Sequence, residues 1–367
     1  MITHRIRLVL LPVSCALLVI STLFFFLDTQ AGGLLYVAED GDCGGMTPCY
    51  EELQEALDAA SPGNEIRIAA GTYPLAAGAD QIALVEKSLT LRGGFSTSDW
   101  TNNDPVANPT IFNALGQGRA MVISGAVEVT VEGLQLTYGN AEGLGGGAQD
   151  EDAGGALYIN GADVTLKENW LMTSATPSDG LGGGLYVMGS PSGFVMEDCV
   201  VQGNYAESGG GVYLREITAT LTNNIIQNNK NEDFGHGAGL RIYSGYSTLY
   251  GNLISHNEGG YGAGLAIAGG QAFMERNTIE YNQTWAWGGG IELTSLNLNP
   301  GDLHLVNNLI QHNYSQDGGG IYVSGSNLTM LRNTLLNNEA TKSGGRHGGG
   351  LNLDSGGGET ILIYDNL

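Results

Sequence analysis

The sequence predicts an all-β fold, a single-stranded parallel β-helix preceded by a short N-terminal capping helix. The main observation is a glycine-rich signature that recurs at intervals of 25 to 30 residues, because such self-similarity indicates stacked supersecondary units. Most units also contain an Asn, two apolar residues, two variable residues and a second Asn. Short alternating stretches such as Leu185-Tyr186-Val187 are typical of strands. The signatures begin at Gly154, Gly182, Gly209, Gly237, Gly262, Gly288, Gly318 and Gly348.

The length of the unit favours a β-helix over other repeat architectures. A unit of 25 to 30 residues accommodates three strands of roughly four residues and three turns, which is one rung of a β-helix. Helical repeats need apolar residues with a 3.6-residue period, and propeller blades need about 40 residues or more. The Leu-x-x-Leu-x-Leu spacing of leucine-rich repeats does not recur.

Residues 1–31 form a signal peptide or an N-terminal anchor. Arg5 and Arg7 precede an uncharged, largely apolar run from Leu8 to Leu27, which is the pattern of an export signal. The run is also just long enough to span a bilayer. We therefore expect an extracellular or cell-surface protein, which contacts a membrane only through this segment if the segment is retained.

Residues 32–64 are expected to form an N-terminal cap that covers the open end of the first rung. The cap contains a predicted helix over Tyr50–Ala60, with Thr47 as its N-cap and Pro48 in the first helical position. One face of this helix is apolar and carries Leu53, Ala56, Leu57 and Ala60. Export makes a disulfide between Cys43 and Cys49 plausible, since the two residues enclose a short loop.

Residues 65–367 are expected to form the β-helix itself. The early rungs are irregular, and segments Gly94–Gly118 and Gly139–Gly154 are predicted to project as loops. The sequence ends at Leu367 in the middle of a predicted rung. We therefore expect that the β-helix is incomplete at this end, or that another chain covers it.

Stacking the rungs places equivalent residues in columns, and two of these columns consist of asparagine. The first contains Asn169, Asn224, Asn252, Asn277, Asn308, Asn333 and Asn366, with Cys199 in its one gap. The second contains Asn204, Asn229, Asn257, Asn282, Asn313 and Asn338. Asn tolerates left-handed backbone angles, and its amide both donates and accepts hydrogen bonds. We interpret both columns as structural ladders, and Cys199 as a buried thiol.

A third column lies between the inward aliphatic residues that follow each glycine signature. Strand alternation directs its members outward, and they are Tyr158, Tyr186, Tyr213, Arg241, Ala266, Glu292, Tyr322 and Asn352. Tyr158, Tyr186 and Tyr213 are therefore predicted to form an exposed aromatic strip. Such a strip is suited to stacking on sugar rings, or it shields the strand backbone. Trp285 and Trp287 lie in a turn that would extend this surface.

Charge argues against nucleic acid as a partner, and ligand chemistry leaves one candidate metal site. The chain has 38 acidic and 14 basic residues, a net charge of -24, so nucleic acid is not an expected partner. The densest acidic segment is Asp150-Glu151-Asp152, a candidate Ca²⁺ site if other segments complete it and otherwise a solvated loop. His256 and His312 occupy equivalent positions two rungs apart, too distant to share a metal ion. No other cofactor is expected.

The Gly-Gly-Gly-Ile-Tyr and Asn-x-Ile-x-x-Asn units, the Cys-bounded cap helix and Ala70-Gly71-Thr72-Tyr73 resemble right-handed parallel β-helix proteins of the pectin-lyase-like superfamily. The resemblance covers residues 32–367. The repeats are also similar to chlamydial polymorphic outer-membrane protein repeats, which implies surface adhesion. Both likenesses imply a right-handed coil. The superfamily includes pectate lyases and polygalacturonases, which implies polysaccharide lysis or hydrolysis as an alternative activity.

The catalytic patterns that this resemblance implies are incomplete in the sequence. Gly235-His236-Gly237 matches the Gly-His-Gly of polygalacturonases, but the Arg follows too soon and the upstream Asp pairs are missing. We therefore interpret His236 as a turn residue and assign no catalytic residue. The leading hypothesis is a non-catalytic protein that binds a polysaccharide or cell-surface ligand through the Tyr column and the two loops. The alternatives are a polysaccharide lyase or glycoside hydrolase, and a structural rod.

Overall fold

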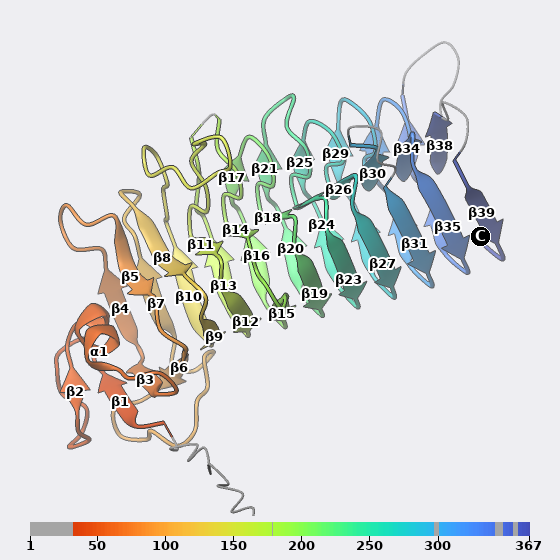
Figure 1. The fold of residues 1–367 in the computed structure, drawn as a ribbon. Helices are drawn as coiled ribbons and strands as arrows, with labels where there is room; N and C mark the ends of the chain where they lie inside the picture. Colours follow the sequence, from red (N-terminus) through yellow and green to blue (C-terminus); the bar gives the residue numbers. More distant parts are fainter. Residues whose placement is uncertain (1–31, 178, 297–300, 342–347, 355–358) are drawn as a thin grey trace, which may run out of the picture. The chain divides into compact units, whose positions relative to one another are not determined.

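The computed structural model of the protein describes residues 32–177, 179–296, 301–341, 348–354 and 359–367. The predicted signal peptide or anchor, residues 1–31, lies outside these ranges. Within them, no helix has the length and apolar content needed to cross a bilayer. The described residues form one compact unit, and the predicted fold is confirmed: the chain coils through parallel sheets whose neighbouring strands come from successive rungs (Figure 1).

Three long sheets form the walls of the coil. Sheet A contains, in spatial order, β2 (Cys49–Tyr50), β1 (Leu34–Val37), β3 (Glu65–Ala69), β6 (Leu89–Phe95), β9 (Glu128–Glu132), β12 (Asp163–Lys167), β15 (Phe194–Glu197), β19 (Thr218–Thr222), β23 (Tyr246–Tyr250), β27 (Gln271–Glu275), β31 (Asp302–Val306), β35 (Asn327–Leu331) and β39 (Ile361–Tyr364). Sheet B contains β4 (Gly71–Pro74), β7 (Thr110–Asn113), β10 (Leu134–Thr137), β13 (Trp170–Met172), β16 (Val200–Gln202), β20 (Ile225–Gln227), β24 (Leu253–Ser255), β28 (Thr278–Glu280), β32 (Leu309–Gln311) and β36 (Thr334–Leu336). Sheet C contains β5 (Gln81–Val85), β8 (Arg119–Ser124), β11 (Leu157–Asn160), β14 (Leu185–Met188), β18 (Val212–Arg215), β22 (Leu240–Tyr243), β26 (Leu265–Ala268), β30 (Ile291–Thr294), β34 (Ile321–Ser324) and β38 (Leu351–Asp354).

A fourth, short sheet was not predicted from the sequence. It contains β17 (Tyr205–Ala206), β21 (Lys230–Asn231), β25 (Glu258–Gly259), β29 (Gln283–Thr284), β33 (Tyr314–Ser315) and β37 (Glu339–Ala340). Each of its strands follows the second ladder Asn of its rung, so a rung passes through sheet A, sheet B, the short sheet and sheet C in turn. Strands of two residues are too short to be recognised by alternation, which needs about four residues or more.

The core of the coil consists of stacked aliphatic residues. Along β12, Val164 and Leu166 are buried while Thr165 between them is partly exposed. Parallel pairing repeats this pattern in the next rung, where Leu166 lies opposite Met196 of β15. Residues such as Leu171, Leu185 and Val187 have no exposed surface. The predicted inward stacks are therefore confirmed, because strict register keeps one side chain above its equivalent.

The N-terminal cap differs from its prediction at one end. Helix α1 spans Leu53–Ala59 and buries Leu53, Ala56 and Leu57, as predicted. However, Glu52 occupies the N-cap position and provides no side-chain cap, so the assignment of Thr47 and Pro48 to the helix start is wrong. The reason is pairing, because Cys49 and Tyr50 are extended as β2 beside β1.

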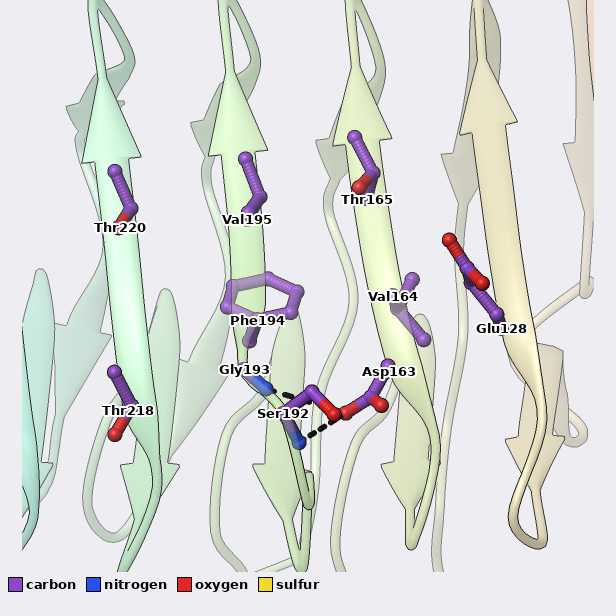
Figure 2. A pocket seen from close by; sticks show the side chains of 10 residues that line it. All are labelled: Glu128, Asp163, Val164, Thr165, Ser192, Gly193, Phe194, Val195, Thr218 and Thr220. Atoms are coloured by element: carbon purple, nitrogen blue, oxygen red, sulfur yellow. Dashed lines mark hydrogen bonds between the residues drawn. The ribbon is translucent and has the colours of Figure 1, made fainter.

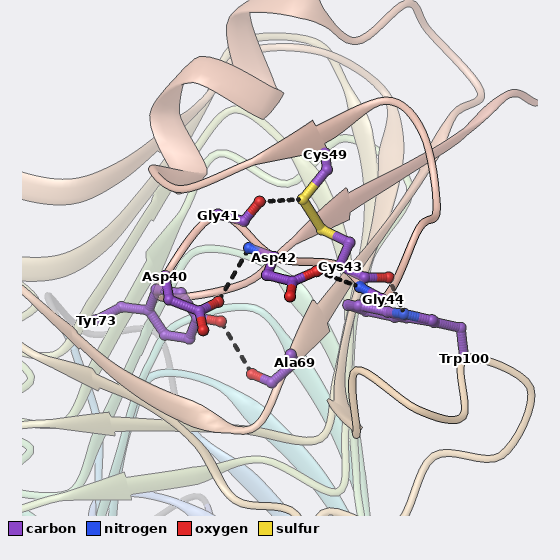
Figure 3. Close-up of a disulfide and its surroundings, with 9 residues drawn as sticks. All are labelled: Asp40, Gly41, Asp42, Cys43, Gly44, Cys49, Ala69, Tyr73 and Trp100. Atoms are coloured by element: carbon purple, nitrogen blue, oxygen red, sulfur yellow. Dashed lines mark hydrogen bonds between the residues drawn. A yellow bond between two sulfur atoms is a disulfide. The ribbon is translucent and has the colours of Figure 1, made fainter.

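The predicted disulfide between Cys43 and Cys49 is confirmed, with an S–S distance of 2.03 Å. Figure 3 shows it between the loop after β1 and the start of β2. The indole N–H of Trp100 donates a hydrogen bond of 3.0 Å to the carbonyl of Cys43, and its ring packs edge-on against Tyr36 at 5.0 Å. The segment between β6 and β7 is thereby attached to the cap.

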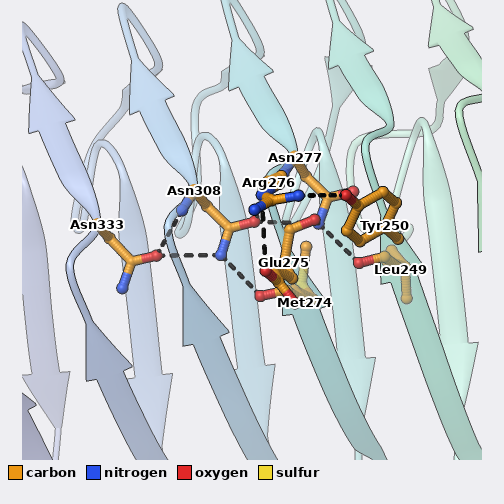
Figure 4. Close-up of polar contacts among 8 residues, drawn as sticks. All are labelled: Leu249, Tyr250, Met274, Glu275, Arg276, Asn277, Asn308 and Asn333. Carbon is orange, nitrogen blue, oxygen red and sulfur yellow. Dashed lines mark hydrogen bonds and ion pairs between the residues drawn. The ribbon is translucent and has the colours of Figure 1, made fainter.

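Both asparagine ladders are confirmed, as Figure 4 shows for the first. The side-chain nitrogen of Asn277 donates to the amide oxygen of Asn308 at 3.0 Å and to the carbonyl of Leu249 at 2.9 Å. The left-handed backbone predicted for the ladder residues instead occurs one position earlier, for example at Arg276 with φ 57°. That residue turns the chain, so the Asn side chain enters the wall and satisfies backbone groups of two rungs.

Cys199 occupies the gap in the first ladder as a buried free thiol, as predicted. Its sulfur accepts a hydrogen bond of 3.4 Å from the backbone N–H of Asn169, and its own N–H donates to the amide oxygen of Asn224 at 2.9 Å. Burial raises the pKa of this thiol to about 12. Since the thiolate is the nucleophilic form, the site is chemically inert at neutral pH.

Candidate ligand-binding face

The predicted tyrosine strip is not a surface, which corrects the expectation from alternation. Tyr158, Tyr186 and Tyr213 do leave the core of the coil, in register on β11, β14 and β18. However, their exposed fractions are only 9%, 0% and 4%. Ala153 and Leu181 pack against them in a second apolar cluster. The three tyrosines therefore do not offer free rings to a ligand.

The cover consists of the chain segments that precede each glycine signature. The residues immediately before Gly154, Gly182 and Gly209 bridge to one another across the rungs. The predicted loop 139–154 also lies over the tyrosines, because the hydroxyl of Tyr158 donates to the carbonyl of Gly146 at 2.9 Å. Alternation along a strand predicts on which side of the sheet a side chain lies. It does not predict whether another segment of the chain covers that side chain.

Exposed aromatic side chains gather instead around the short sheet. Tyr281, Trp285, Trp287 and Tyr314 are 46%, 42%, 38% and 38% exposed. In one rung the exposed residues Tyr281, Gln283, Trp285 and Trp287 alternate with the buried residues Asn282, Thr284 and Ala286. The strand-like alternation thus continues through the turn. We define the aromatic face as His256, Tyr281, Trp285, Trp287, His312 and Tyr314.

Two kinds of ring occupy the aromatic face. Tyr281 stacks between His256 and His312 with ring centroids 5.1 and 4.9 Å apart, so these rings cover each other's faces and present polar edges. Trp287 similarly lies 5.1 Å from both Tyr261 and Tyr322. Trp285 and Tyr314 have no ring partner among the described residues. Their faces are the ones on which an apolar group can stack.

Polar side chains border these two free rings. Tyr314 pairs in register with Gln283, which pairs in turn with Glu258. Glu258 is bound by Lys230 at 2.9 Å, while the amide of Gln311 donates to Glu280 at 2.6 Å. The aromatic face therefore combines flat apolar rings with amide and carboxylate groups at its border, and Lys230 beside it is already paired.

A buried acidic side chain, Glu292, lies in register with Tyr322, the ring partner of Trp287. Glu292 is 1% exposed, and its carboxylate contacts the ring nitrogen Nδ1 of His236 at 2.8 Å and Nη1 of Arg241 at 3.9 Å. The contact with His236 crosses two rungs, and the intervening outward position is the small residue Ala266. A buried carboxylate needs such partners. His236 is not the predicted turn residue: it forms an isolated parallel bridge with Tyr261 just before Gly237 and stacks on the ring of Tyr261 at 4.9 Å.

A groove on sheet A does not contain a free pair of carboxylates. It has a volume of about 240 Å³ and is lined by Glu128, Asp163 and residues of the next two rungs (Figure 2). Asp163 accepts hydrogen bonds from the backbone N–H of Ser192 at 2.7 Å and of Gly193 at 3.2 Å. Burial alone would raise the pKa of Asp163, but these bonds hold it below its usual value. Its carboxylate is thus engaged in fixing a turn.

The segment Asp150–Asp152 shows no convergence toward a Ca²⁺ ion. The carboxylate of Asp152 accepts the backbone N–H groups of Gly143 and Gly145 at 2.8 and 2.7 Å, and Glu151 accepts that of Gln149 at 2.7 Å. Among the described residues, no three His, Cys, Asp or Glu side chains are grouped so that they could hold a metal ion. The carboxylates of this segment therefore stabilise the conformation of their own loop.

The sequence contained a signal for part of the aromatic face. His256, Tyr281 and His312 all directly precede a residue of the second Asn ladder, so alignment of the repeats places them in one column. Alignment gives the column but not the stacking of the Tyr281 ring between the two histidines. Trp285 and Trp287 were predicted to be ligand-binding residues, and the structure places both on the exposed face. Tyr314 was not singled out.

Residues 207–367 match the family model described as right handed beta helix region. Among solved structures, the chain is similar to the crystal structure of pectate lyase Pel9A, with 13% sequence identity, a TM-score of 0.39, and coverage of 92% of this chain and 78% of that chain. A comparison with curated proteins gave no match. The family match agrees with the right-handed coil that the resemblance implied. The likeness to polymorphic outer-membrane protein repeats is not among these matches.

Proposed function

We propose that this right-handed parallel β-helix is an exported, non-catalytic protein of the cell surface or extracellular space that binds neutral glycans through the aromatic face. The observation that supports the proposal is the pair of exposed rings, Trp285 and Tyr314, which have no ring partner among the described residues. Aromatic rings with one free face pack against the apolar faces of sugar rings. Nearby amide and phenol groups supply hydrogen bonds to hydroxyls.

The charge of the protein favours a neutral glycan over an acidic one. The chain carries a net charge of -24, which repels a polyanion. Several of its basic side chains are also engaged by acids, as in the contacts of Arg92 with Glu132 at 3.2 Å and of Lys230 with Glu258 at 2.9 Å. A ligand with a carboxylate on each sugar would have to displace such pairs.

The proposal is tested by measuring the affinity of the full chain for neutral polysaccharides such as xyloglucan and galactomannan. We expect the double variant Trp285→Ala/Tyr314→Ala to bind the recognised glycan about thirtyfold more weakly, since each of the two lost ring contacts is worth on the order of 1 kcal/mol. Tyr246→Ala is the control, because Tyr246 is an aromatic residue of similar exposure, 46%, that lies on sheet A. Equal affinity in the double variant and the control would refute the role of the face.

The enzymatic alternative is tested with the same protein. It is incubated with polygalacturonate, with and without Ca²⁺, and unsaturated or reducing ends are measured. Formation of either product would replace the proposal with a lyase or hydrolase. The absence of both glycan binding and product formation would favour a structural rod.

A further inference from the structure

A separate cavity lies at the N-terminal ends of strands β10 and β13 of sheet B. These rungs do not contribute to the aromatic face. The cavity has a volume of about 190 Å³. Its apolar walls are Pro105, Val106, Leu134 and Trp170, and its polar wall consists of Glu168 and Asp198. Pro105 and Val106 belong to the segment between β6 and β7, while Trp170 is the first residue of β13. The cavity is thus formed by a loop that lies against one sheet.

The side chain of Trp170 lines this cavity. It is 39% exposed, and it has no ring partner among the described residues. Its neighbours in register on sheet B are Gln135 and Val200, so no other aromatic residue flanks it in the sheet. The indole is the best of the aromatic side chains at attracting a cation to its face.

The two carboxylates occupy equivalent positions on successive rungs. Glu168 and Asp198 each precede a residue of the first ladder column, with φ of 54° and 52°, and both side chains are exposed. Neither has an ion-pair or side-chain hydrogen-bond partner among the described residues. The nearby basic side chains do not neutralise these two carboxylates. Lys167 lies in register between Glu132 and Glu197 on sheet A, and Arg92 contacts Glu132 at 3.2 Å.

This combination selects a cation that also has an apolar surface. Two unpaired carboxylates attract positive charge, while the indole, proline and valine surfaces favour a weakly hydrated group over a hydrated metal ion. Ca²⁺ would need six or more oxygen ligands, and the described residues contain no suitable group of three acidic, His or Cys side chains. The volume is that of a small organic group.

We propose that the cavity between Trp170, Val106, Glu168 and Asp198 binds an alkylated ammonium group of the trimethylammonium type. The cation lies against the indole face, and the two carboxylates neutralise its charge. The group is carried either by a free small molecule such as choline or by a phosphatidylcholine headgroup. This inference does not depend on the glycan-binding proposal, because none of the residues involved belongs to the aromatic face.

The test follows the indole N–H resonances of the full chain, which contains 4 tryptophans, during titration with choline. Trp170→Phe identifies the signal of Trp170. We expect that signal to shift saturably with choline while the signals of Trp285 and Trp287 stay unchanged. The neutral isostere 3,3-dimethylbutan-1-ol has the same shape without the charge, and we expect it to bind at least about tenfold more weakly.

The variant Glu168→Gln/Asp198→Asn keeps the shape of the cavity but removes its charge, and Asn is well suited to the left-handed backbone at position 198. We expect about tenfold weaker choline binding with an unchanged melting temperature. Glu142→Gln/Glu339→Gln removes the same charge from exposed positions elsewhere and should leave binding unchanged. Phosphatidylcholine vesicles, tested by sedimentation, distinguish a lipid source from a free ligand. Equal binding of choline and its isostere, or no saturable shift of the Trp170 signal, would overturn the proposal.

Discussion

Single residues in the two asparagine ladders satisfy backbone groups that the turns leave unpaired. In each ladder the amide oxygen of one Asn accepts both the backbone N–H and the side-chain N–H of the Asn in the preceding rung, as with Asn308 and Asn277 at 2.9 and 3.0 Å. The residue before each Asn adopts the left-handed backbone, even where it is as large as His256 or Tyr281. The ladder thus stabilises a conformation that such residues rarely adopt.

Cys199 is the weak point of the first ladder, since sulfur is a poor acceptor for the N–H of Asn169. We expect Cys199→Asn to raise the free energy of unfolding by about 1 kcal/mol, because an amide oxygen would replace the sulfur. Cys199→Ala, which removes the acceptor altogether, should lower it. Urea denaturation followed by circular dichroism measures both changes. A Cys199→Asn protein less stable than the wild type would contradict this account.

At the scale of elements, the second apolar layer over sheet C determines which outward residues reach solvent. The hydroxyl of Tyr158 donates to Gly146 in the covering loop at 2.9 Å, whereas the buried hydroxyl of Tyr186 has no hydrogen-bond partner among the described residues. Burial raises the pKa of Tyr186 well above its usual value. The two tyrosines therefore occupy equivalent positions and differ in whether their hydroxyl makes a hydrogen bond.

We expect Tyr158→Phe to lower the free energy of unfolding by about 1 kcal/mol, because it removes a hydrogen bond between the loop and the strand. Tyr186→Phe should leave stability unchanged or increase it, because it removes a buried hydroxyl that lacks a partner. Chemical denaturation of both variants under the same conditions decides the comparison. A larger loss for Tyr186→Phe than for Tyr158→Phe would indicate an additional partner for that hydroxyl.

At the scale of the whole molecule, repulsion among the excess negative charges destabilises the folded state. A net charge of -24 on 367 residues produces repulsion that salt screens. We expect the melting temperature to rise when NaCl is increased from about 10 mM to about 150 mM, as the screening length falls from about 30 to about 8 Å. Repeating the salt series near pH 4.5, where carboxylates begin to protonate, should give a smaller rise. A melting temperature independent of salt at pH 7 would show that repulsion is not limiting.

The repeats in the sequence predicted the fold because each rung depends on its own residues and those of its neighbours. Alternating aliphatics such as Leu185 and Val187 set the inward faces, and the Asn columns set the turns. The cap helix was predicted from its apolar face, but its start was misplaced because pairing of Cys49 and Tyr50 with β1 is a contact between distant segments. Register within the stack is thus readable from the sequence, whereas pairing at its irregular end is not.

The sequence by itself determined the coil, its core, the ladders and the disulfide, since these follow from periodicity and from the chemistry of single residues. Only the tertiary structure decided which outward columns are surface. Tyr186 is buried and Trp285 is exposed although both lie outside the core, because solvent access depends on where the covering turns run. The contact of Glu292 with His236 across two rungs likewise depends on three-dimensional proximity that no repeat spacing specifies.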